Sequence, residues 1–316
     1  TVPLPVNSSQ SNLFVNSLLE DTGRQCIWIG TEGYLFQYFP STGQMKQTEA
    51  FHNNSIKSLA LDGNGYLLAG TDNGLYVYHN DVTPLQHIIH DSRNIQSLTN
   101  NIIWNIFADQ EHNIWLGTDY GISLSRYNSA LQFIPISQIT GTGDGNQFYS
   151  LFRDSKGFYW FGGTNGLIRF TDPAGDKHNA IWYRMGDKTY PLSHNRIRHI
   201  YEDKEQQLWI ATDGSINRYD YATRQFVHYN IVDSTGTYNT NWTYYMFEDN
   251  AGHLWISTCL GGIFVVDKHR LMQSASGQYV AEQNYSVHNG LSGMFINQII
   301  PDNEGNVWAV SYTHLT

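Results

Sequence analysis

The chain has 316 residues, more than an ordinary single core accommodates, so two domains or one large repeat architecture is expected. Its 14% aromatic residues, 28 glycines and only 15% charged residues are typical of many short strands joined by tight turns. A net charge of −10 with 18 Lys and Arg residues argues against nucleic acid as a partner. The sequence has no apolar run of about 18 residues, so no membrane span is predicted. The chain begins at Thr1 without a signal sequence, so we expect a processed product or an excised piece.

A short motif recurs along the whole chain. It consists of a strand reading Trp-Ile-Gly-Thr, a turn and then Gly-Leu, with copies beginning at Trp28, Leu68, Trp115, Trp160, Trp209, Trp255 and Trp308. Successive copies are 40 to 53 residues apart, which is the length of four short strands and their turns. Upstream of each copy an Asp precedes a turn, at Asp21, Asp62, Asp109, Asp154, Asp203, Asp249 and Asp302.

Each repeat predicts four antiparallel strands in chain order. An inner strand ends at the turn Asp, the Trp strand follows, and a third and a fourth strand complete the unit, as in Leu167 to Phe170 and Gln225 to Tyr229. A single sheet of this kind cannot bury its faces alone, whereas sheets stacked around an axis can. The Trp side chains are therefore expected to pack between neighbouring sheets, and Leu68 in place of Trp is expected to weaken the packing of the second one.

The fold class predicted is all-β, a seven-bladed β-propeller of four-stranded blades that occupies residues 1–316 as one domain. Blades are expected to start near residues 13, 54, 101, 146, 195, 241 and 294. The last blade is a special case, since only Ala309 to Thr316 follow its Trp308. Either the residues before Leu13 add a strand and close the ring, or the chain is cut short and this blade stays incomplete.

The consensus of the copies resembles the two-component-regulator propeller repeat. It reads Asn-x-Ile-x-x-Ile-x-x-Asp-x-x-Gly-x-Leu-Trp-Ile-Gly-Thr-x-x-Gly-Leu and is clearest from Asn101 to Ile122 and from Asn195 to Ile216. The resemblance covers residues 13 to 310 and is to the periplasmic sensor region of hybrid two-component systems from gut Bacteroidetes. Departures are Leu68 for Trp, Gly163 for Thr and Ser215 for Gly.

This resemblance implies a larger parent receptor. Such a parent carries further propeller and immunoglobulin-like modules, a membrane helix, a histidine kinase, a receiver and a DNA-binding module, and is expected to be a homodimer in the inner membrane. The chain is then the periplasmic ligand-sensing propeller, which contacts the neighbouring modules, touches the membrane only through the parent protein and makes no nucleic acid contact. Family members generally sense oligosaccharides and control polysaccharide-utilisation genes, so an oligosaccharide ligand is implied by similarity.

Site candidates are sought where the copies differ. The residue three before the turn Asp is always apolar and is assigned to the core, whereas positions seven and five before it vary. Residues two apart share one face of a strand, and the first strand of a blade runs innermost, so these side chains are expected to converge on the axial mouth. Two inserted loops, Asp172–His194 and Asn230–Asn241, add to this region. The candidate ligand-binding residues are Trp104, Tyr149, Arg196, Arg198, Trp242, Tyr244, His194 and Asn297.

The chemistry of these residues fits a sugar ligand. Aromatic rings offer flat apolar faces to a sugar ring, and Arg196 and Arg198 could fork onto a carboxylate or a sulfate. One alternative is that the side chains fill blade interfaces or form solvated ion pairs. Two other functions stay open, a scaffold that binds a protein or dimerises through the propeller face, and a propeller-fold polysaccharide lyase or glycosidase.

No cofactor, metal site or catalytic set is predicted. The 13 His residues are scattered, and the glycine-rich run Gly141 to Gly145 precedes a strand and does not open a helix. The chain itself is therefore predicted not to be an enzyme, although its parent should carry a kinase. Cys26 and Cys259 belong to distant repeats, which favours two buried free thiols over a disulfide.

Overall fold

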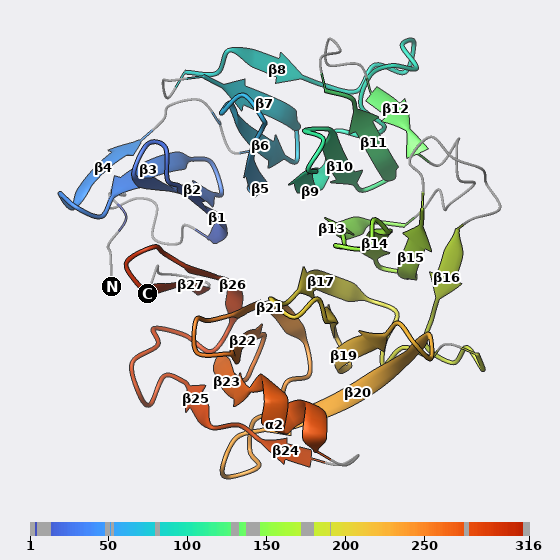
Figure 1. Cartoon of the computed structure of the whole chain (residues 1–316). Helices are drawn as coiled ribbons and strands as arrows, with labels where there is room; N and C mark the ends of the chain where they lie inside the picture. The colour runs from blue at the N-terminus through green and yellow to red at the C-terminus, as the bar shows by residue number, and fades with distance from the viewer. Residues whose placement is uncertain are drawn as a thin grey trace.

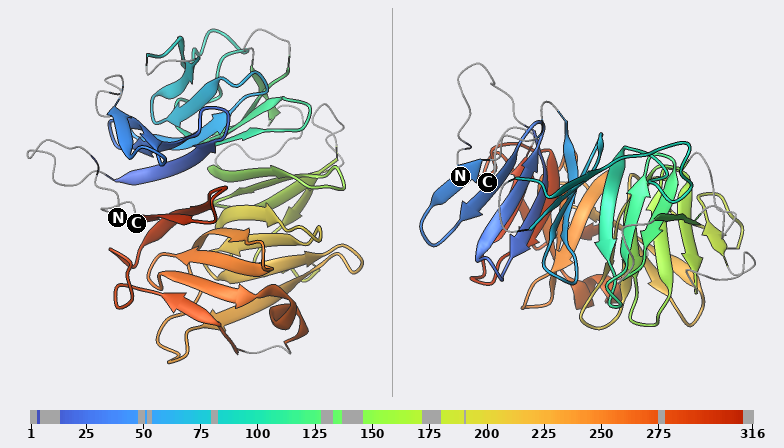
Figure 2. Two further views of the ribbon diagram at one scale, coloured as in Figure 1. Left: turned by 60° about the vertical axis from the view of Figure 1, so that its left-hand side comes forward. Right: turned by 90° about the horizontal axis from the view of Figure 1, so that it is seen from above.

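The blades stand around a central axis (Figure 1). The computed structural model describes residues 14–47, 54–79, 83–127, 133–136, 146–171, 180–189, 191–274 and 278–311, together with Leu4 and Phe51. Seen edge-on, the strands run across the thickness of the ring (Figure 2). The predicted all-β propeller of four-stranded antiparallel blades is confirmed.

Six sheets have at least four strands, with the first strand nearest the axis. The first three are β1 (Val15–Asp21), β2 (Cys26–Thr31), β3 (Leu35–Phe39) and β4 (Gln44–Gln47); β5 (Ile56–Leu61), β6 (Leu67–Thr71), β7 (Gly74–Tyr78) and β8 (Gln86–Ile88); and β9 (Ile103–Ala108), β10 (Ile114–Thr118), β11 (Gly121–Ser125) and β12 (Phe133–Pro135).

The next three sheets include one with an added strand. They are β13 (Phe148–Arg153), β14 (Tyr159–Gly163), β15 (Gly166–Phe170) and β16 (Ile181–Tyr183); β17 (Ile197–Glu202), β18 (Leu208–Thr212), β19 (Ser215–Asp220), β20 (Gln225–Val232) and β24 (Gln278–Val280); and β21 (Thr243–Glu248), β22 (His253–Thr258), β23 (Ile263–Asp267) and β25 (Gln283–Tyr285). The added strand β24 pairs parallel to β20 and comes from the connection between β23 and β25, after the helix α2 (Lys268–Gln273).

The predicted count of seven four-stranded blades is not confirmed. In the described residues the seventh sheet has two strands, β26 (Ile296–Pro301) and β27 (Val307–Ser311). These two strands lie against β1 and complete the circle (Figure 1). Apart from Leu4, which packs on the cluster that includes Val310, the residues before Leu13 lie outside the described residues, as do residues 312–316. The added N-terminal strand therefore remains a prediction.

The Trp strands form the core between blades. All residues of β2, β6, β10, β14 and β18 are buried, because each sheet is covered on both faces by its neighbours. Trp115 packs with Phe148 and Phe161 of the next blade, and Trp160 packs with Ile197 and Tyr219 of the blade after that. The predicted role of the Trp residues as inter-blade core is confirmed.

The turn Asp has a constant role at the end of the inner strand. Its Oδ1 atom accepts backbone N–H groups of its own turn, as Asp154 does from Lys156 and Phe158. Its Oδ2 atom accepts the indole N–H of the Trp six or seven residues later at 2.7 to 3.1 Å, in the pairs Asp21–Trp28, Asp109–Trp115, Asp154–Trp160, Asp203–Trp209, Asp249–Trp255 and Asp302–Trp308. One carboxylate thus ties the turn to the core in six of the sheets.

The helix α2 adds a cation to one of these turns. Lys268 is fully buried, and its Nζ lies 2.8 Å from Oε1 of Glu248 and 3.2 Å from Oδ2 of Asp203. A buried ammonium needs such partners, because burial removes the water that would solvate it.

In the described part of the chain, no helix has the length and apolar character of a membrane span. Cys26 and Cys259 are buried free thiols, as predicted.

Candidate functional site

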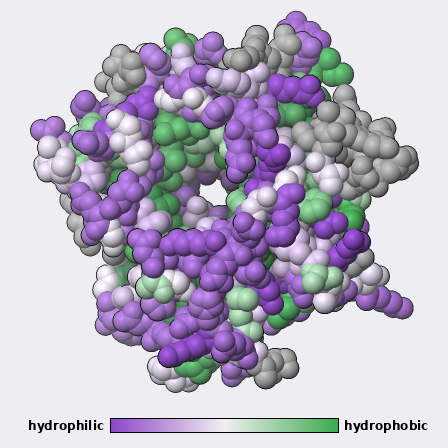
Figure 3. All heavy atoms as spheres, in the orientation of Figure 1, coloured by the Kyte–Doolittle hydropathy of each residue, from purple (hydrophilic) through white to green (hydrophobic). Residues whose placement is uncertain are grey.

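A cavity of about 620 Å³ lies on the axis and is lined by the inner strands of all seven sheets. The space-filling view shows an opening at the centre of the ring (Figure 3). One end of the channel is the mouth, which is bordered by the loops that lead into the inner strands and by the turns after the Trp strands. The cavity is within the range of about 300–1,000 Å³ that is usual for ligand pockets.

A β-bulge occurs at the same position of every inner strand. In each one the pairing with the Trp strand skips a single residue, the one five before the turn Asp. The extra residue disturbs the alternation of side chains, so two consecutive residues face the same side. Both the bulged residue and the one after it therefore line the channel.

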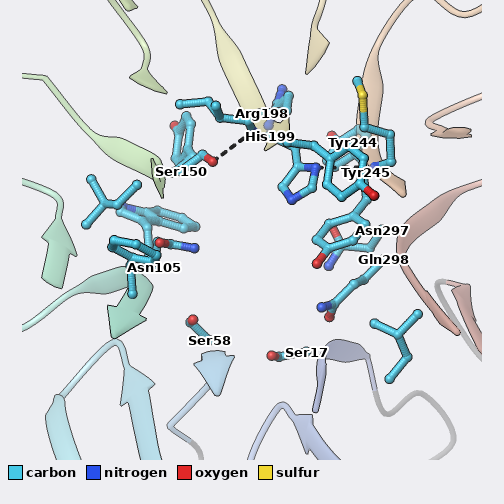
Figure 4. Close-up of a pocket in the computed structure, with 18 of the residues that line it drawn as sticks. Ser17, Ser58, Asn105, Ser150, Arg198, His199, Tyr244, Tyr245, Asn297 and Gln298 are labelled. Atoms are coloured by element: carbon cyan, nitrogen blue, oxygen red, sulfur yellow. Dashed lines mark hydrogen bonds between the residues drawn. The ribbon is translucent and has the colours of Figure 1, made fainter. Parts of the chain in front are cut away.

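Two rings of side chains result. The mouth ring consists of the bulged residues Asn16, Lys57, Trp104, Tyr149, Arg198, Tyr244 and Asn297. The inner ring consists of the residues that follow them, Ser17, Ser58, Asn105, Ser150, His199, Tyr245 and Gln298. Figure 4 shows the inner-ring side chains surrounding the open centre of the channel. The seven sheets thus contribute five types of side chain to each ring.

The arginines of the mouth are already paired. Arg198 makes two hydrogen bonds to the carboxylate of Asp213, with Nε 2.6 Å from Oδ1 and Nη2 3.1 Å from Oδ2. Arg196 lies outside the cavity lining, is 44% exposed, and approaches the same carboxylate at 3.7 Å. A guanidinium neutralised by a bidentate carboxylate has little left to offer an anionic ligand. Both side chains face Asp213, and their predicted fork onto an acidic ligand stays a prediction.

The aromatic rings of the mouth contact the cations of neighbouring blades. Nζ of Lys57 lies 4.4 Å from the ring centroid of Trp104, whose edge-to-face neighbour is Tyr149 at 5.2 Å. The guanidinium of Arg198 lies 4.6 Å from the ring centroid of Tyr244. Burial raises the pKa of Tyr149 and Tyr244, so both phenols keep their protons at neutral pH. From Lys57 to Tyr244 the mouth ring is therefore a continuous row of cations and aromatic rings that contact one another across blade boundaries.

The inner ring fastens neighbouring inner strands to one another. In four places an inner-ring side chain accepts a backbone N–H from the next blade, at 2.7 to 3.3 Å, in the pairs Ser58–Ile106, Ser150–Ile200, His199–Met246 and Gln298–Leu18. Gln298 also donates to the carbonyl of Leu18 at 3.2 Å, and Asn297 donates to the carbonyl of Asn16 at 2.9 Å. These amides join the two-stranded seventh sheet to the first blade.

His199 is held neutral in this ring. Its Nδ1 accepts the N–H of Met246, so the proton is on Nε2, and its ring stacks on Tyr245 with centroids 3.8 Å apart. Burial lowers the pKa of His199 to about 3, because the imidazolium would lose its hydration. The side chain is therefore an uncharged donor toward the channel at neutral pH.

Five of the eight predicted site residues line the cavity, namely Trp104, Tyr149, Arg198, Tyr244 and Asn297. Three do not. Arg196 and Trp242 lie one residue before β17 and β21, where they border the mouth, and Trp242 is 48% exposed. His194 lies further out in the loop, where its Nδ1 accepts the N–H of Arg196 at 3.0 Å. Residues 172–179 and Tyr190 of the first inserted loop lie outside the described residues.

The bulge explains why Arg196 and Trp242 lie outside the cavity lining. Positions seven and five before the turn Asp were expected to share a face, but the bulge at position five breaks the two-residue period. The whole inner ring was missed for the same reason. The sequence does contain a signal, because the buried rows lie six and three before the Asp, as in Ile103 and Ile106. An odd spacing between two core positions of one strand indicates an extra residue between them.

The fold is a propeller of repeated sheets, and the side chains that line its axial channel vary from sheet to sheet. The sequence model of the two-component regulator propeller matches residues 97–120, 142–165 and 191–214. The chain therefore contains two-component-regulator propeller repeats, as its consensus predicts.

Solved structures of extracellular domains from two-component systems are similar to this chain. The extracellular domain of a hybrid two-component system from B. thetaiotaomicron is 94% identical, with a TM-score of 0.55, and the alignment covers 98% of this chain and 42% of that chain. A second such domain from the same organism is 18% identical over 98% of this chain and 40% of that chain, with a TM-score of 0.75, and shows the fold alone. The high identity to an extracellular domain confirms the predicted location outside the cytoplasm.

A curated relative is longer still. The protein called histidine kinase P4 of Formosa agariphila is 26% identical in an alignment 240 residues long, which covers 68% of this chain and 16% of that protein. The chain thus spans less than half the length of each of these three relatives.

Proposed function

We propose that this chain is the ligand-sensing propeller of a hybrid two-component sensor histidine kinase, and that an oligosaccharide binds at the axial mouth. The observation that carries the proposal is the mouth ring, in which the same bulge presents five types of side chain around the axis, namely Asn, Lys, Trp, Tyr and Arg. A bulge that serves only ring closure would not require chemical variety at that position. Variety around one axis suits a ligand with different groups on each side.

The chemistry of the two rings supports a polyhydroxylated ligand. Amides and hydroxyls supply both donors and acceptors, and the faces of the aromatic rings supply apolar contact to the C–H groups of a sugar. Neither ring contains Asp or Glu, the residues on which glycoside hydrolysis usually depends, which supports a binding role over a glycosidase. The pairing of Arg198 with Asp213 favours a neutral sugar over an acidic one.

Signalling would then depend on rigid bodies. The ring is closed by side-chain bonds between inner strands, so useful motion is expected between this propeller and a neighbouring module or a second protomer. Ligand would favour the arrangement in which it makes more contacts. Solution scattering of the complete extracellular region should change on saturation with the cognate glycan, and identical profiles would contradict this mechanism.

The binding site can be tested with a matched pair of variants. Calorimetry of the complete extracellular region against neutral, uronic-acid and sulfated oligosaccharides identifies the glycan. Tyr244→Ala, which removes a mouth-ring side chain, should then weaken binding about tenfold or more. Trp242→Ala, two residues away on the exposed border, should change affinity less than about twofold.

The outcome separates the site from the function. Should a glycan bind while Tyr244→Ala and Asn297→Ala both retain full affinity, the axial site is wrong although sensing stands. Should no oligosaccharide in a broad panel bind the complete region, the sensing proposal itself fails.

A second candidate function is supported by the surface around the mouth. Several large apolar side chains on the loops of this face are 46% to 67% exposed, namely Ile89, Ile95, Tyr120, Met185, Trp242, Leu260 and Val287. Apolar groups gathered on one face favour a protein contact. A scaffold role predicts that the double change Trp242→Ser and Leu260→Ser alters the self-association of the extracellular region without changing glycan affinity, which sedimentation velocity can measure.

A further inference from the structure

The second blade lacks the Trp that the other sheets have. In six sheets the indole N–H of this Trp is bonded to Oδ2 of the turn Asp, but the second blade has Leu68 at that position. Leu68 is fully buried and packs on the third blade, against Ile103 and Ile106. It cannot replace either the volume or the N–H of an indole ring.

A cavity of about 240 Å³ lies beside Leu68, between the second and third blades, where the other sheets have the indole ring of the Trp. Leu68 and Asp62 both line it, and the third blade contributes His112 and Ile114. At its border lie Leu85 and Tyr127, which are 60% and 42% exposed. An apolar cavity of about 150 Å³ is enough to hold benzene, so this cavity has room for a two-ring system. It is too small for an oligosaccharide and opens on the face opposite the mouth, where the β5–β6 turn lies.

The carboxylate of Asp62 has an unused oxygen in this cavity. Its Oδ1 accepts the N–H groups of Asn64 and Tyr66 at 2.9 and 2.7 Å, which fixes the turn. In the part of the chain that the structure describes, no hydrogen bond or ion pair reaches Oδ2. The side chain is half-buried, so this oxygen can still accept a bond from a group that enters the cavity.

At the equivalent turns Oδ2 of the Asp has two donors, whereas Oδ2 of Asp62 has none among the described residues. Besides the indole, the next blade often adds its own donor to Oδ2, as in Tyr159–Asp109 at 3.5 Å, Tyr221–Asp154 at 2.7 Å and Lys268–Asp203 at 3.2 Å. Tyr127 is equivalent to Tyr221, because each lies six residues after the first residue of its strand, β11 or β19. Its hydroxyl makes no bond to Asp62 among the described residues. The second blade thus has both the space and the acceptor that its neighbours have filled.

We propose that this cleft between the second and third blades binds an indole ring, the N–H of which donates to Oδ2 of Asp62. The six filled turns show which group fits this geometry, because each contains an indole at that place with its N–H on the same carboxylate oxygen. Leu68, Val77 and Ile114 provide the apolar walls, and the carboxylate gives direction. The site is separate from the axial mouth and does not depend on the proposed sensing function.

The test uses two ligands of similar size. Calorimetry of the complete chain with indole should show saturable binding, and 1-methylindole, which lacks the N–H, should bind about tenfold more weakly, as expected for loss of a hydrogen bond to a charged acceptor. N-acetyl-tryptophanamide identifies the source of the group. If it binds as well as indole, a tryptophan side chain of a polypeptide is the ligand, whereas binding of indole alone indicates a free small molecule.

Two variants distinguish the cleft from other apolar surfaces. Leu68→Trp should fill the cavity, raise the Tm and abolish indole binding. Asp62→Asn keeps Oδ1 for the turn but replaces Oδ2 by an amide donor, so it should reduce the preference for indole over 1-methylindole to about onefold even if Leu68→Trp folds poorly. Equal affinities of the two ligands for the unmodified protein, or indole binding that persists in Asp62→Asn with the same preference, would overturn the proposal.

Discussion

The two ends of an inner strand follow opposite rules. At the turn end the same carboxylate holds the same indole in six sheets, and the one exception leaves a cavity. At the channel end the backbone is equally constant, with a bulge in every sheet, but the bulged residue is of five different types among the seven sheets. The repeated contacts define the ring, and the varied ones are free to define what it binds.

The largest loss of stability is expected at a turn where the indole and the carboxylate are paired. Trp160→Ala removes a fully buried indole and leaves Oδ2 of Asp154 with fewer donors, so the free energy of unfolding should fall by about 3–5 kcal/mol. Denaturant unfolding of this variant beside Trp242→Ala measures the contrast, because the exposed Trp242 should cost less than about 1 kcal/mol. Similar losses in both variants would contradict the assignment of core and border.

Lys268 tests a contact that only one turn possesses. Lys268→Met keeps much of the side-chain volume but leaves Glu248 and Asp203 without their shared cation, so a loss of about 3 kcal/mol is expected. Thermal and urea unfolding should both report it. The exposed Lys46 provides the control, since Lys46→Met should stay within about 0.5 kcal/mol of the unmodified protein.

A smaller effect is expected at the closure of the ring. Gln298→Ala removes both bonds to Leu18, leaves a backbone N–H without its acceptor, and should cost about 1–3 kcal/mol. Ser17 has the same position in the first blade and makes no inter-blade bond among the described residues. If Ser17→Ala proves as costly as Gln298→Ala in urea unfolding, the amide bridge does not hold the seventh sheet.

The smallest effect is one of pH. The pKa of His199 is about 3 in the folded chain and near 6.5 when unfolded, so below pH 6.5 the unfolded state binds a proton that the folded state does not. Stability is therefore complete above pH 6.5 and declines as the pH falls toward 3. His199→Gln, which can still accept the N–H of Met246 as Gln298 accepts that of Leu18, should lose about 1 kcal/mol less than the unmodified protein between pH 7 and 5.5. Parallel pH profiles for the two proteins would show that His199 is not held neutral.

The sequence by itself determined the propeller, the four-stranded blades and the role of each Trp, because these depend on contacts that every copy repeats. It also placed Trp104, Tyr149, Arg198, Tyr244 and Asn297 near the axis. The core positions of the innermost strand are apolar in every copy, so its variable positions are expected to face the channel.

Only the tertiary structure decided the rest. The inner ring follows from a bulge, which depends on pairing with the neighbouring strand, and the pairing of Arg198 with Asp213 joins residues from a strand and a turn 15 positions apart. The cavity beside Leu68 likewise depends on how the third blade packs against the second, and the residues of one blade alone do not define that space.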